Sequence, residues 1–417
     1  MDKMVVMGSG PLKGTVATSG AKNAALPILF STLLAEGTHV FKNVPKLKDI
    51  ESTAELLQSL GCETKWIGDE FHVSVSPLQS YEASYDLVRK MRASFLCMGP
   101  MLAKYGEAVV SQPGGCAIGS RPIDLHLAGF QALGAEITQK EGYVHAASKK
   151  LKGATFLFET VTVGGTENVM MAATLADGIT ILENAAKEPE IVDLAEYLNK
   201  MGAKITGHGT SVIRIEGVSK LKPAVHSIMP DRIEAGTLLI AGAITKGQVT
   251  VTKCVPAHLE ALILKMREAG FKIETTADTM TVFPCDKWEA VDITTAPHPL
   301  FPTDLQAQFM ALMTVAHGTS VISETVFENR FMHVTELTRL GADITPKTRV
   351  AVVRGKPGQL TGAPVMATDL RASASLVLAG LVASGETVVN RIYHLDRGYE
   401  KLEDKLSSLG AKIRRIE

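Results

Sequence analysis

The hydrophobic and polar residues of the chain follow one pattern that repeats along its length. An amphipathic, helix-like stretch ends in Gly followed by a small or apolar residue, and a short strand-like run comes next. Glycine is the expected residue there, because a helix C-cap needs a positive φ. The six glycines, spaced by about 70 residues, are Gly61, Gly134, Gly202, Gly270, Gly341 and Gly410. The pattern predicts six similar units that fill almost the whole chain.

Each unit is predicted to alternate helices and strands. The fifth has a helix-like run over 303–312, a strand-like run over 319–324, a second helix that ends at Gly341 and a strand over 350–353. The sixth repeats this order. Six units could form one ring, an open solenoid or two domains of three units each. Two domains of about 200 residues fit the usual domain size best, with 227–231 as a candidate crossing between them.

Composition argues against several classes of function. The chain has 417 residues, a formal net charge of -1 and only 5% aromatic residues. The charge balance argues against a nucleic-acid coat, and the few aromatic residues argue against base-stacking platforms. No apolar run approaches the ~18 residues of a membrane span, and the N-terminus lacks the apolar stretch of a signal peptide.

The cysteines and histidines give no sign of a disulfide framework or a metal site. The cysteines are odd in number, widely spaced and without a CxxC pair; they are Cys62, Cys97, Cys116, Cys254 and Cys285. A reducing compartment fits this usage, so the cytoplasm is the expected location. The histidines show no metal-ligand spacing, and no GxGxxG follows a strand. Neither a metal nor a nicotinamide or flavin cofactor is expected.

The first helices of the units open with polar or charged residues. These are Lys22, Asn23, Arg92, Gly165, Thr166, Asp231, Arg232, Asp304, Asp369 and Arg371, and the second helices add Arg121 and Arg397. Asp and Thr could simply be N-caps, and Arg is often a surface residue. Basic residues at a helix N-terminus, however, oppose the macrodipole. Several of them together indicate an anionic ligand, because helix N-termini also bind anions.

Two segments between helices could take part in chemistry. Residues 19–27 resemble a phosphate loop but lack its first glycine, although Lys22 could still act as a point charge for an anion. Residues 112–122 contain three Gly and two Pro, which predicts a mobile loop. Within it, Cys116 near Arg121 could act as a nucleophile or an acid. A Cys-His hydrolase is one interpretation, but no motif pairs a particular histidine with this cysteine.

Ten stretches of the chain resemble motifs of the enolpyruvyl transferases. The most specific are SGAKNAALPILF and PGGCAIGSRPIDLH. In order, the ten stretches are 19–30, 43–50, 91–94, 113–126, 183–193, 230–237, 295–309, 324–334, 366–380 and 391–406. Ten matches in one order are not expected by chance, and they extend over the whole chain.

The resemblance implies a two-domain inside-out α/β barrel of six βαβαββ-type repeats, three per domain. One domain would cover 22–229 and carry the Cys116 loop, the other would combine 1–21 with 230–417, and the active site would lie in the cleft between them. The implied reaction transfers enolpyruvyl from phosphoenolpyruvate to the 3-hydroxyl of UDP-N-acetylglucosamine and releases phosphate. This is the first committed step of peptidoglycan synthesis, a cytoplasmic reaction that needs no metal and is a target of fosfomycin.

The resemblance also assigns roles to residues. Asp304 would orient or deprotonate the 3-hydroxyl, and Cys116 would protonate C3 of phosphoenolpyruvate. The phosphoenolpyruvate-binding residues would be Lys22, Asn23, Arg92, Arg121, Arg371 and Arg397, with Lys22 and Arg397 also taking part in catalysis. The UDP-sugar would be bound by Asn23, Arg92, Arg121, Pro122, Ile123, Asp124, Leu125, Thr160, Val161, Thr162, Val163, Gly164, Asp304 and Val326. Thr160 stands where some members of the family carry Lys.

Two alternatives remain at this point. The shikimate-pathway enolpyruvyl transferases are similar in fold, but their lysine usually lies in a Gly-Asp-Lys-Ser context and they have no cysteine loop. A non-enzymatic array of six repeats that binds partners on its surface is the other. That interpretation predicts tolerance to substitution at Cys116 and Lys22. No motif identifies a protein partner.

Overall fold

The computed structural model describes residues 2–113 and 123–417. Three predicted site residues, Cys116, Arg121 and Pro122, lie outside the described residues.

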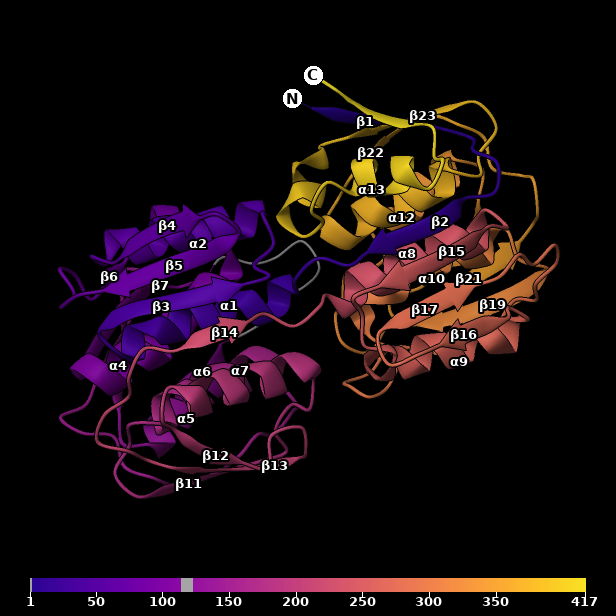
Figure 1. Cartoon of the computed structure of the whole chain (residues 1–417). Coiled ribbons are helices and arrows are strands. Elements are labelled where there is room, and N and C mark those ends of the chain that lie inside the picture. The colour runs from indigo at the N-terminus through magenta and orange to yellow at the C-terminus, as the bar shows by residue number, and fades with distance from the viewer. Residues whose placement is uncertain (1, 114–122) are drawn as a thin grey trace. The chain divides into compact units, whose positions relative to one another are not determined.

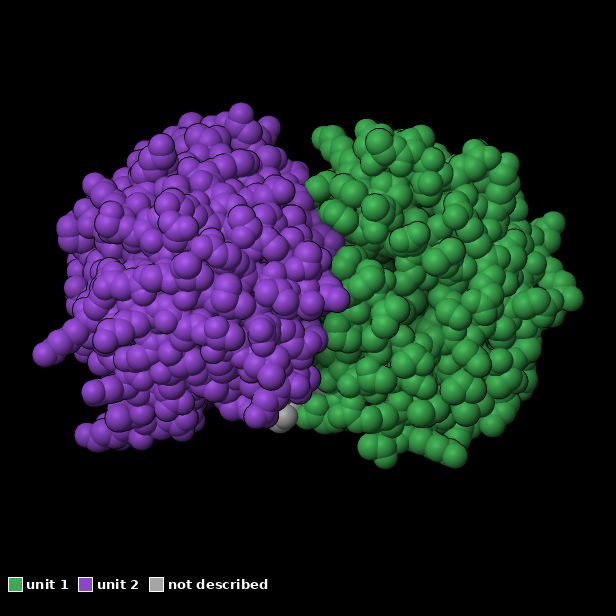
Figure 2. All heavy atoms as spheres, turned by 90° about the horizontal axis from the view of Figure 1, so that it is seen from below, with its two compact units in different colours: residues 1–19, 116–120, 230–417 green, residues 20–115, 121–229 purple. Residues whose placement is uncertain are grey.

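The chain forms two compact units (Figures 1 and 2). Unit 1 contains the residues up to Ser19 and those from Pro230 onward, and unit 2 contains the described residues from Gly20 to Met229. One passage between the units therefore falls between Met229 and Pro230, within the stretch 227–231.

Each unit contains three four-stranded sheets that share one topology. The first two strands of every sheet are parallel, and each later strand is antiparallel to the one before it. The sheets of unit 2 are β14 (Val225–Ser227), β3 (Gly37–Lys42), β5 (Glu70–Val75) and β4 (Glu63–Ile67); β6 (Glu82–Ala83), β7 (Glu107–Ser111), β9 (Tyr143–Ala147) and β8 (Glu136–Lys140); and β10 (Thr155–Leu157), β11 (Ile179–Glu183), β13 (Val212–Glu216) and β12 (Lys204–Thr206). Those of unit 1 are β2 (Lys13–Ala17), β15 (Gln248–Thr252), β17 (Thr279–Val282) and β16 (Ile273–Thr275); β18 (Ile293–Thr294), β19 (Gly318–Ser323), β21 (Val350–Gly355) and β20 (Asp343–Pro346); and β22 (Pro364–Met366), β23 (Glu386–Asn390), β1 (Lys3–Met7) and β24 (Ile413–Ile416).

Each repeat also has an inner and an outer helix. The inner helices are α1 (Lys22–Ser31), α4 (Met98–Tyr105) and α6 (Val163–Ala173) in unit 2, and α8 (Arg232–Ile244), α10 (Gln306–Thr314) and α12 (Leu370–Gly380) in unit 1. The outer ones are α2 (Lys48–Ser59), α5 (Asp124–Ala132), α7 (Pro189–Lys200), α9 (Glu260–Ala269), α11 (His333–Arg339) and α13 (Leu402–Ser408), with a further short helix, α3 (Tyr85–Val88). Among residues 2–113 and 123–417, every helix is too short or too polar to span a bilayer.

The burial of these elements explains why the helices lie inside and the sheets outside. All residues of α8 are buried, and α10 contacts both α8 and α12. A helix that is apolar on every side must be covered on every side. The strands alternate instead, as in β5, and so cover the helices with one face only. The six repeats and the inside-out arrangement implied by the resemblance are confirmed.

Three sheets take a strand from a distant part of the chain. β14 comes just before α8 but lies in unit 2, with Val225 opposite Val40 of β3. β2 comes just before α1 but lies in unit 1, parallel to β15. In the last sheet β1 lies between β23 and the C-terminal β24, so that the two ends of the chain are neighbours (Figure 1). Unit 1 therefore needs both ends of the chain to complete its sheets.

The glycines that mark the ends of the repeats have the predicted backbone geometry. All six lie at positive φ, from 89° at Gly134 to 113° at Gly270. Residues other than glycine rarely adopt a positive φ, so glycine at each position allows the chain to leave the outer helix and enter the next strand.

Candidate functional site

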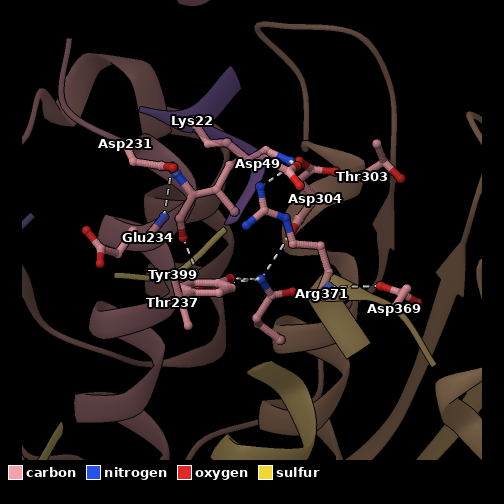
Figure 3. Close-up of polar contacts among 12 residues, drawn as sticks. Lys22, Asp49, Asp231, Glu234, Thr237, Thr303, Asp304, Asp369, Arg371 and Tyr399 are labelled. Atoms are coloured by element: carbon pink, nitrogen blue, oxygen red, sulfur yellow. Dashed lines mark hydrogen bonds and ion pairs between the residues drawn. The ribbon is translucent and has the colours of Figure 1, made fainter. Parts of the chain in front are cut away.

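In unit 1 the candidate site is built around Asp304, which lies in the short helix η4 (Thr303–Leu305) just before α10. Two guanidinium groups hold its carboxylate. Arg330 Nη2 lies 2.8 Å from Oδ1 and Arg371 Nη2 lies 2.9 Å from Oδ2. Figure 3 shows Asp304 beside Arg371. Arg330 and Arg371 are both nearly inaccessible to solvent, so these are charge-assisted hydrogen bonds in a poorly solvated place.

A second layer of hydrogen bonds holds Arg330. Its Nη1 donates to Thr303 Oγ1 at 2.8 Å, and Thr303 Oγ1 donates to Glu324 Oε2 at 2.9 Å. The other oxygen of Glu324 accepts the backbone N–H of Val326 at 2.9 Å. The predicted UDP-sugar residue Val326 and the predicted catalytic residue Asp304 are therefore linked through one buried carboxylate.

The N-terminus of α12 positions Arg371. Asp369 caps this helix, and its Oδ1 accepts the backbone N–H groups of Arg371 and Ala372 at 2.8 and 3.0 Å. The simple N-cap interpretation is therefore correct for Asp369. Asp304 differs, because both of its carboxylate oxygens bind arginines.

The charges around Asp304 decide its protonation state. Burial favours the neutral acid, but the positive charges of Arg371 and Arg330 and their hydrogen bonds outweigh burial. They hold the pKa of Asp304 well below its usual range. The pKa of Arg371 is raised in turn, because the attraction of Asp304 outweighs the effect of burial. Both groups are ionised at neutral pH.

Arg397 lies in the same unit, at the end of the short helix η5 (Ile392–Arg397). His394 belongs to this helix. Burial lowers the pKa of His394, and the positive charge of Arg397 lowers it further. His394 is therefore neutral, and of these two side chains Arg397 carries the positive charge.

In unit 2 the N-terminus of α1 presents Lys22 and Asn23. Lys22 Nζ lies 3.3 Å from Asp49 Oδ2, and Asp49 is almost fully buried in α2. The preceding Gly20 has no room for a side chain, because a Cβ there would lie 1.8 Å from the carbonyl oxygen of Asn43. The close approach of these two backbone segments explains why Gly20 precedes the lysine.

The other predicted residues of unit 2 also lie at helix starts. Arg92 opens the short helix η2 (Arg92–Cys97), and Asp124 and Leu125 open α5. Thr162 caps α6, its Oγ1 accepting the N–H of Gly165 at 3.2 Å, and Thr160 and Val161 come just before it.

Two of these helix starts are neighbours. The ring of His126 in α5 lies beside Gly164 in α6, where a Cβ would come within 3.2 Å of it. His126 Nδ1 is also 3.1 Å from Asn168 Nδ2, one turn further along α6. The starts of α5 and α6 thus form one surface, to which Ile123, Asp124 and Val163 also belong by sequence.

Several residues of these clusters escaped the sequence analysis. Arg330, Asp49 and Glu324 contact the predicted site residues Asp304, Lys22 and Val326, and Thr303 joins Arg330 to Glu324, but none of the four was itself singled out. Their position in the sequence could have indicated them, because all four lie within stretches that resemble the family motifs.

Three of the four described cysteines are poorly suited to react. Burial raises the pKa of the Cys62 thiol to about 12 and that of Cys254 to about 11, and it raises the pKa of Cys97 as well. Cys285 is partly exposed, with Sγ 3.1 Å from the carbonyl oxygen of Lys287. None of the four forms a disulfide. Among the described residues, no cluster of His, Cys, Asp and Glu side chains could hold a metal ion.

Comparisons with known proteins agree on one group. The family model described as EPSP synthase (3-phosphoshikimate 1-carboxyvinyltransferase) matches residues 6–406. A curated protein from Bdellovibrio bacteriovorus, named UDP-N-acetylglucosamine 1-carboxyvinyltransferase, is 92% identical over 99% of this chain and 100% of its own. One of the same name from Myxococcus xanthus is 59% identical over 100% of this chain and 99% of its own.

Solved structures share the fold. The enolpyruvyl transferase NikO from Streptomyces tendae aligns with a TM-score of 0.89 at 25% identity, over 99% of this chain and 98% of its own. EPSP synthase from Acinetobacter baumannii aligns with a TM-score of 0.76 at 17% identity, over 100% of both chains. The second likeness concerns the fold alone.

His333 beside Arg330 is expected to make the protein sensitive to acid. It is buried, hydrogen-bonds to the backbone of Arg330, and has its pKa lowered by burial to about 4. The neutral form is thus favoured on folding. Its contribution is complete above the unfolded pKa of about 6.5 and is lost as the pH falls through the folded pKa. We expect a loss of about 2 kcal/mol between pH 7 and pH 5 from this group.

Urea unfolding at the two pH values measures this. In His333→Asn, which cannot titrate, the difference in unfolding free energy between pH 7 and pH 5 should shrink by about 2 kcal/mol. An unchanged difference in the variant would contradict the assignment.

Proposed function

The chain belongs to the EPSP synthase family, and from this premise we propose that it transfers the enolpyruvyl group of phosphoenolpyruvate to the 3-hydroxyl of UDP-N-acetylglucosamine and releases phosphate. The observation that carries the proposal is similarity over the whole chain, at 56% to 92% identity, to curated relatives named for this activity. The reaction would serve peptidoglycan synthesis. The free cysteines among the described residues support a cytoplasmic location.

The cationic groups of both units support a reaction between two anions. Lys22 and Arg92 lie at helix starts in unit 2. In unit 1, Arg371 lies at the start of α12 and Arg397 at the end of η5. In a chain of formal net charge -1, cations collected at helix starts give a local positive potential that attracts phosphate and carboxylate. We propose that these residues, with Arg121, hold phosphoenolpyruvate.

The UDP-sugar would be held by the starts of α5 and α6, by Asn23 and by Val326. Thr160 offers a hydroxyl where a lysine would offer a charge, so the diphosphate contact there would be a hydrogen bond alone. The shikimate-pathway alternative has less support, because the relative of that name is only 17% identical. The surface-binding alternative does not account for a carboxylate held by two buried arginines.

The reaction needs one proton placed on C3 and one removed from the sugar. As the 3-hydroxyl oxygen bonds to C2 of phosphoenolpyruvate, Cys116 would give its proton to C3. The resulting tetrahedral intermediate would lose phosphate from C2, which departs with the proton of the 3-hydroxyl. The proton lost from C3 would return to the Cys116 thiolate, which restores the double bond and the thiol. An unperturbed thiol has a pKa of about 8.5, so most of it carries the proton at pH 7.

The electrostatics of Asp304 favour orientation of the hydroxyl over its deprotonation. A general base works best with a pKa near the working pH. The pKa of Asp304 is held far below that by Arg371 and Arg330. A permanently ionised carboxylate can accept a hydrogen bond from the 3-hydroxyl and direct its oxygen toward C2, while remaining a weak base.

A coupled phosphate-release assay tests the proposed function. With phosphoenolpyruvate and UDP-N-acetylglucosamine, phosphate should appear together with the enolpyruvyl sugar nucleotide. With shikimate 3-phosphate in place of the nucleotide sugar, no phosphate should appear. Release with shikimate 3-phosphate alone would establish the alternative, and release with neither acceptor would argue against both enzymes.

Asp304→Asn keeps the shape of the side chain and removes its charge. We expect kcat to fall by about 10²-fold, the cost of a misplaced reacting group, with the KM for the UDP-sugar nearly unchanged. Steady-state kinetics measure both. Asp231→Asn is the matched control, because Asp231 caps α8 through Ile233 N and Glu234 N and Asn is an equally good cap. Normal turnover by Asp304→Asn with a lowered Tm would mean that the residue is only structural.

Fosfomycin, a small anionic epoxide that resembles phosphoenolpyruvate, should alkylate Cys116 and abolish activity. Peptide mapping by mass spectrometry should find the label on that cysteine, and labelling should be faster when the UDP-sugar is bound. Cys116→Asp should keep some activity, because a carboxylic acid also donates a proton, and should escape the epoxide. Inactivation with the label on Cys62, Cys97, Cys254 or Cys285 would overturn the assignment.

A further inference from the structure

Tyr399 touches all three inner helices of unit 1. It follows Arg397 and Gly398 at the end of η5 and is 2% exposed. Its hydroxyl lies 2.9 Å from Thr237 Oγ1 on α8 and 3.0 Å from Gln308 Nε2 on α10. Its ring lies under Arg371 of α12, with the guanidinium carbon 5.4 Å from the ring centroid. Figure 3 shows Tyr399 between Thr237 and Arg371.

With Gln308 as donor to both hydroxyl oxygens, one arrangement of the protons satisfies Thr237 and Tyr399 together. Thr237 Oγ1 donates to Ile233 O at 2.8 Å, so it can only accept from Tyr399. The Tyr399 hydroxyl, having donated its proton to Thr237, must accept from Gln308. Burial raises the pKa of Tyr399, so the hydroxyl keeps the proton that this arrangement requires.

Gln308 connects the network to Asp304. Its Nε2 also donates to the backbone carbonyl oxygen of Asp304 at 2.9 Å. Its Oε1 has no hydrogen-bond partner within the described part of the chain. Turning the amide over would place Oε1 against the carbonyl oxygen of Asp304, where neither oxygen can donate. The carbonyl oxygen of Asp304, which can only accept, therefore fixes the orientation of the amide, and the hydroxyl of Tyr399 accepts a further hydrogen bond from the same nitrogen.

Tyr399 thus acts on both members of the Asp304–Arg371 ion pair by separate routes. Its ring supports the guanidinium of Arg371 through a cation–π contact, which gains strength where water is excluded. Its hydroxyl supports the backbone of Asp304 through Gln308. The guanidinium of Arg371 is buried, so the contact with the ring helps to hold it in place.

We propose that Tyr399 is a positioning residue that keeps Asp304 and Arg371 in their reactive geometry, with its ring acting on Arg371 and its hydroxyl acting on Asp304 through Gln308. This inference rests on the proposed function, because it assigns the effect to turnover of the two substrates. It predicts that substitution of Tyr399 lowers kcat by more than the accompanying change in Tm would explain.

The test compares Tyr399→Phe and Tyr399→Leu in the full-length protein, each alone and combined with Arg371→Lys. Removing the hydroxyl alone should lower kcat by about fivefold to tenfold, the worth of one neutral hydrogen bond. Leu should lower it further, since the ring contact is lost as well. The KM for UDP-N-acetylglucosamine should stay within about twofold in both variants, since losses in kcat alone reflect the transition state.

The combined variants show whether Tyr399 acts through Arg371. If it does, Tyr399→Leu should cost clearly less in the Arg371→Lys background than in the native one, because contacting residues are not additive. Should Tyr399→Leu fail to fold by circular dichroism, the size of the kcat loss in Tyr399→Phe decides the matter. Tyr197→Phe is the matched control, since Tyr197 is equally buried in unit 2, where its hydroxyl bonds to His39.

The proposal is overturned if Tyr399→Phe lowers the Tm as Tyr197→Phe does while kcat stays within twofold of the native value. It is also overturned if the effects of Tyr399→Leu and Arg371→Lys on kcat simply add. Failure of the proposed function is recognised separately, because the native protein would then release no phosphate from phosphoenolpyruvate with UDP-N-acetylglucosamine.

Discussion

The packing of helices that are apolar on every side is the constraint on which the architecture depends. An inner helix such as α8 has no polar face to turn toward water, so other elements must surround it. Three amphipathic sheets per unit provide that cover. Polar side chains that cannot enter this core are displaced to the helix ends. The same packing that keeps reactive polar side chains out of the middle of each unit therefore places them at the helix starts.

At one of those starts, electrostatics determine what the carboxylate of Asp304 can do. A lone buried carboxylate would tend to be protonated, but Arg371 and Arg330 reverse this tendency. The arrangement gives a fixed negative charge flanked by two fixed positive ones. Such a preorganised set suits the alignment of a hydroxyl beside an anion, because no charge has to be created or moved before the bond forms.

The described cysteines also differ in reactivity. Burial raises the pKa of Cys62, Cys97 and Cys254, which makes these thiols unreactive members of the core. Three of the four described thiols are thereby poor competitors of Cys116 for an alkylating anion. The selectivity proposed for Cys116 would follow from this difference.

The sequence by itself determined the repeat and the helix ends, and it predicted the elements that we propose to carry the chemistry. Gly270 shows why. A positive φ is a local requirement, and a single glycine in the sequence is enough to indicate it. The same holds for the N-caps Asp369 and Thr162. The resemblance supplied the inside-out fold, which neither composition nor spacing could have given.

Only the tertiary structure decided which strands and side chains meet. β2 and β14 each lie in the unit opposite to the helix that follows them, and no local signal indicates this, because pairing depends on strands distant in the chain. The partners of Asp304 come from positions 330 and 371, and Tyr399 reaches Thr237 across 162 residues. The pKa of a carboxylate depends on the charges within a few ångströms, and those neighbours are brought together by folding.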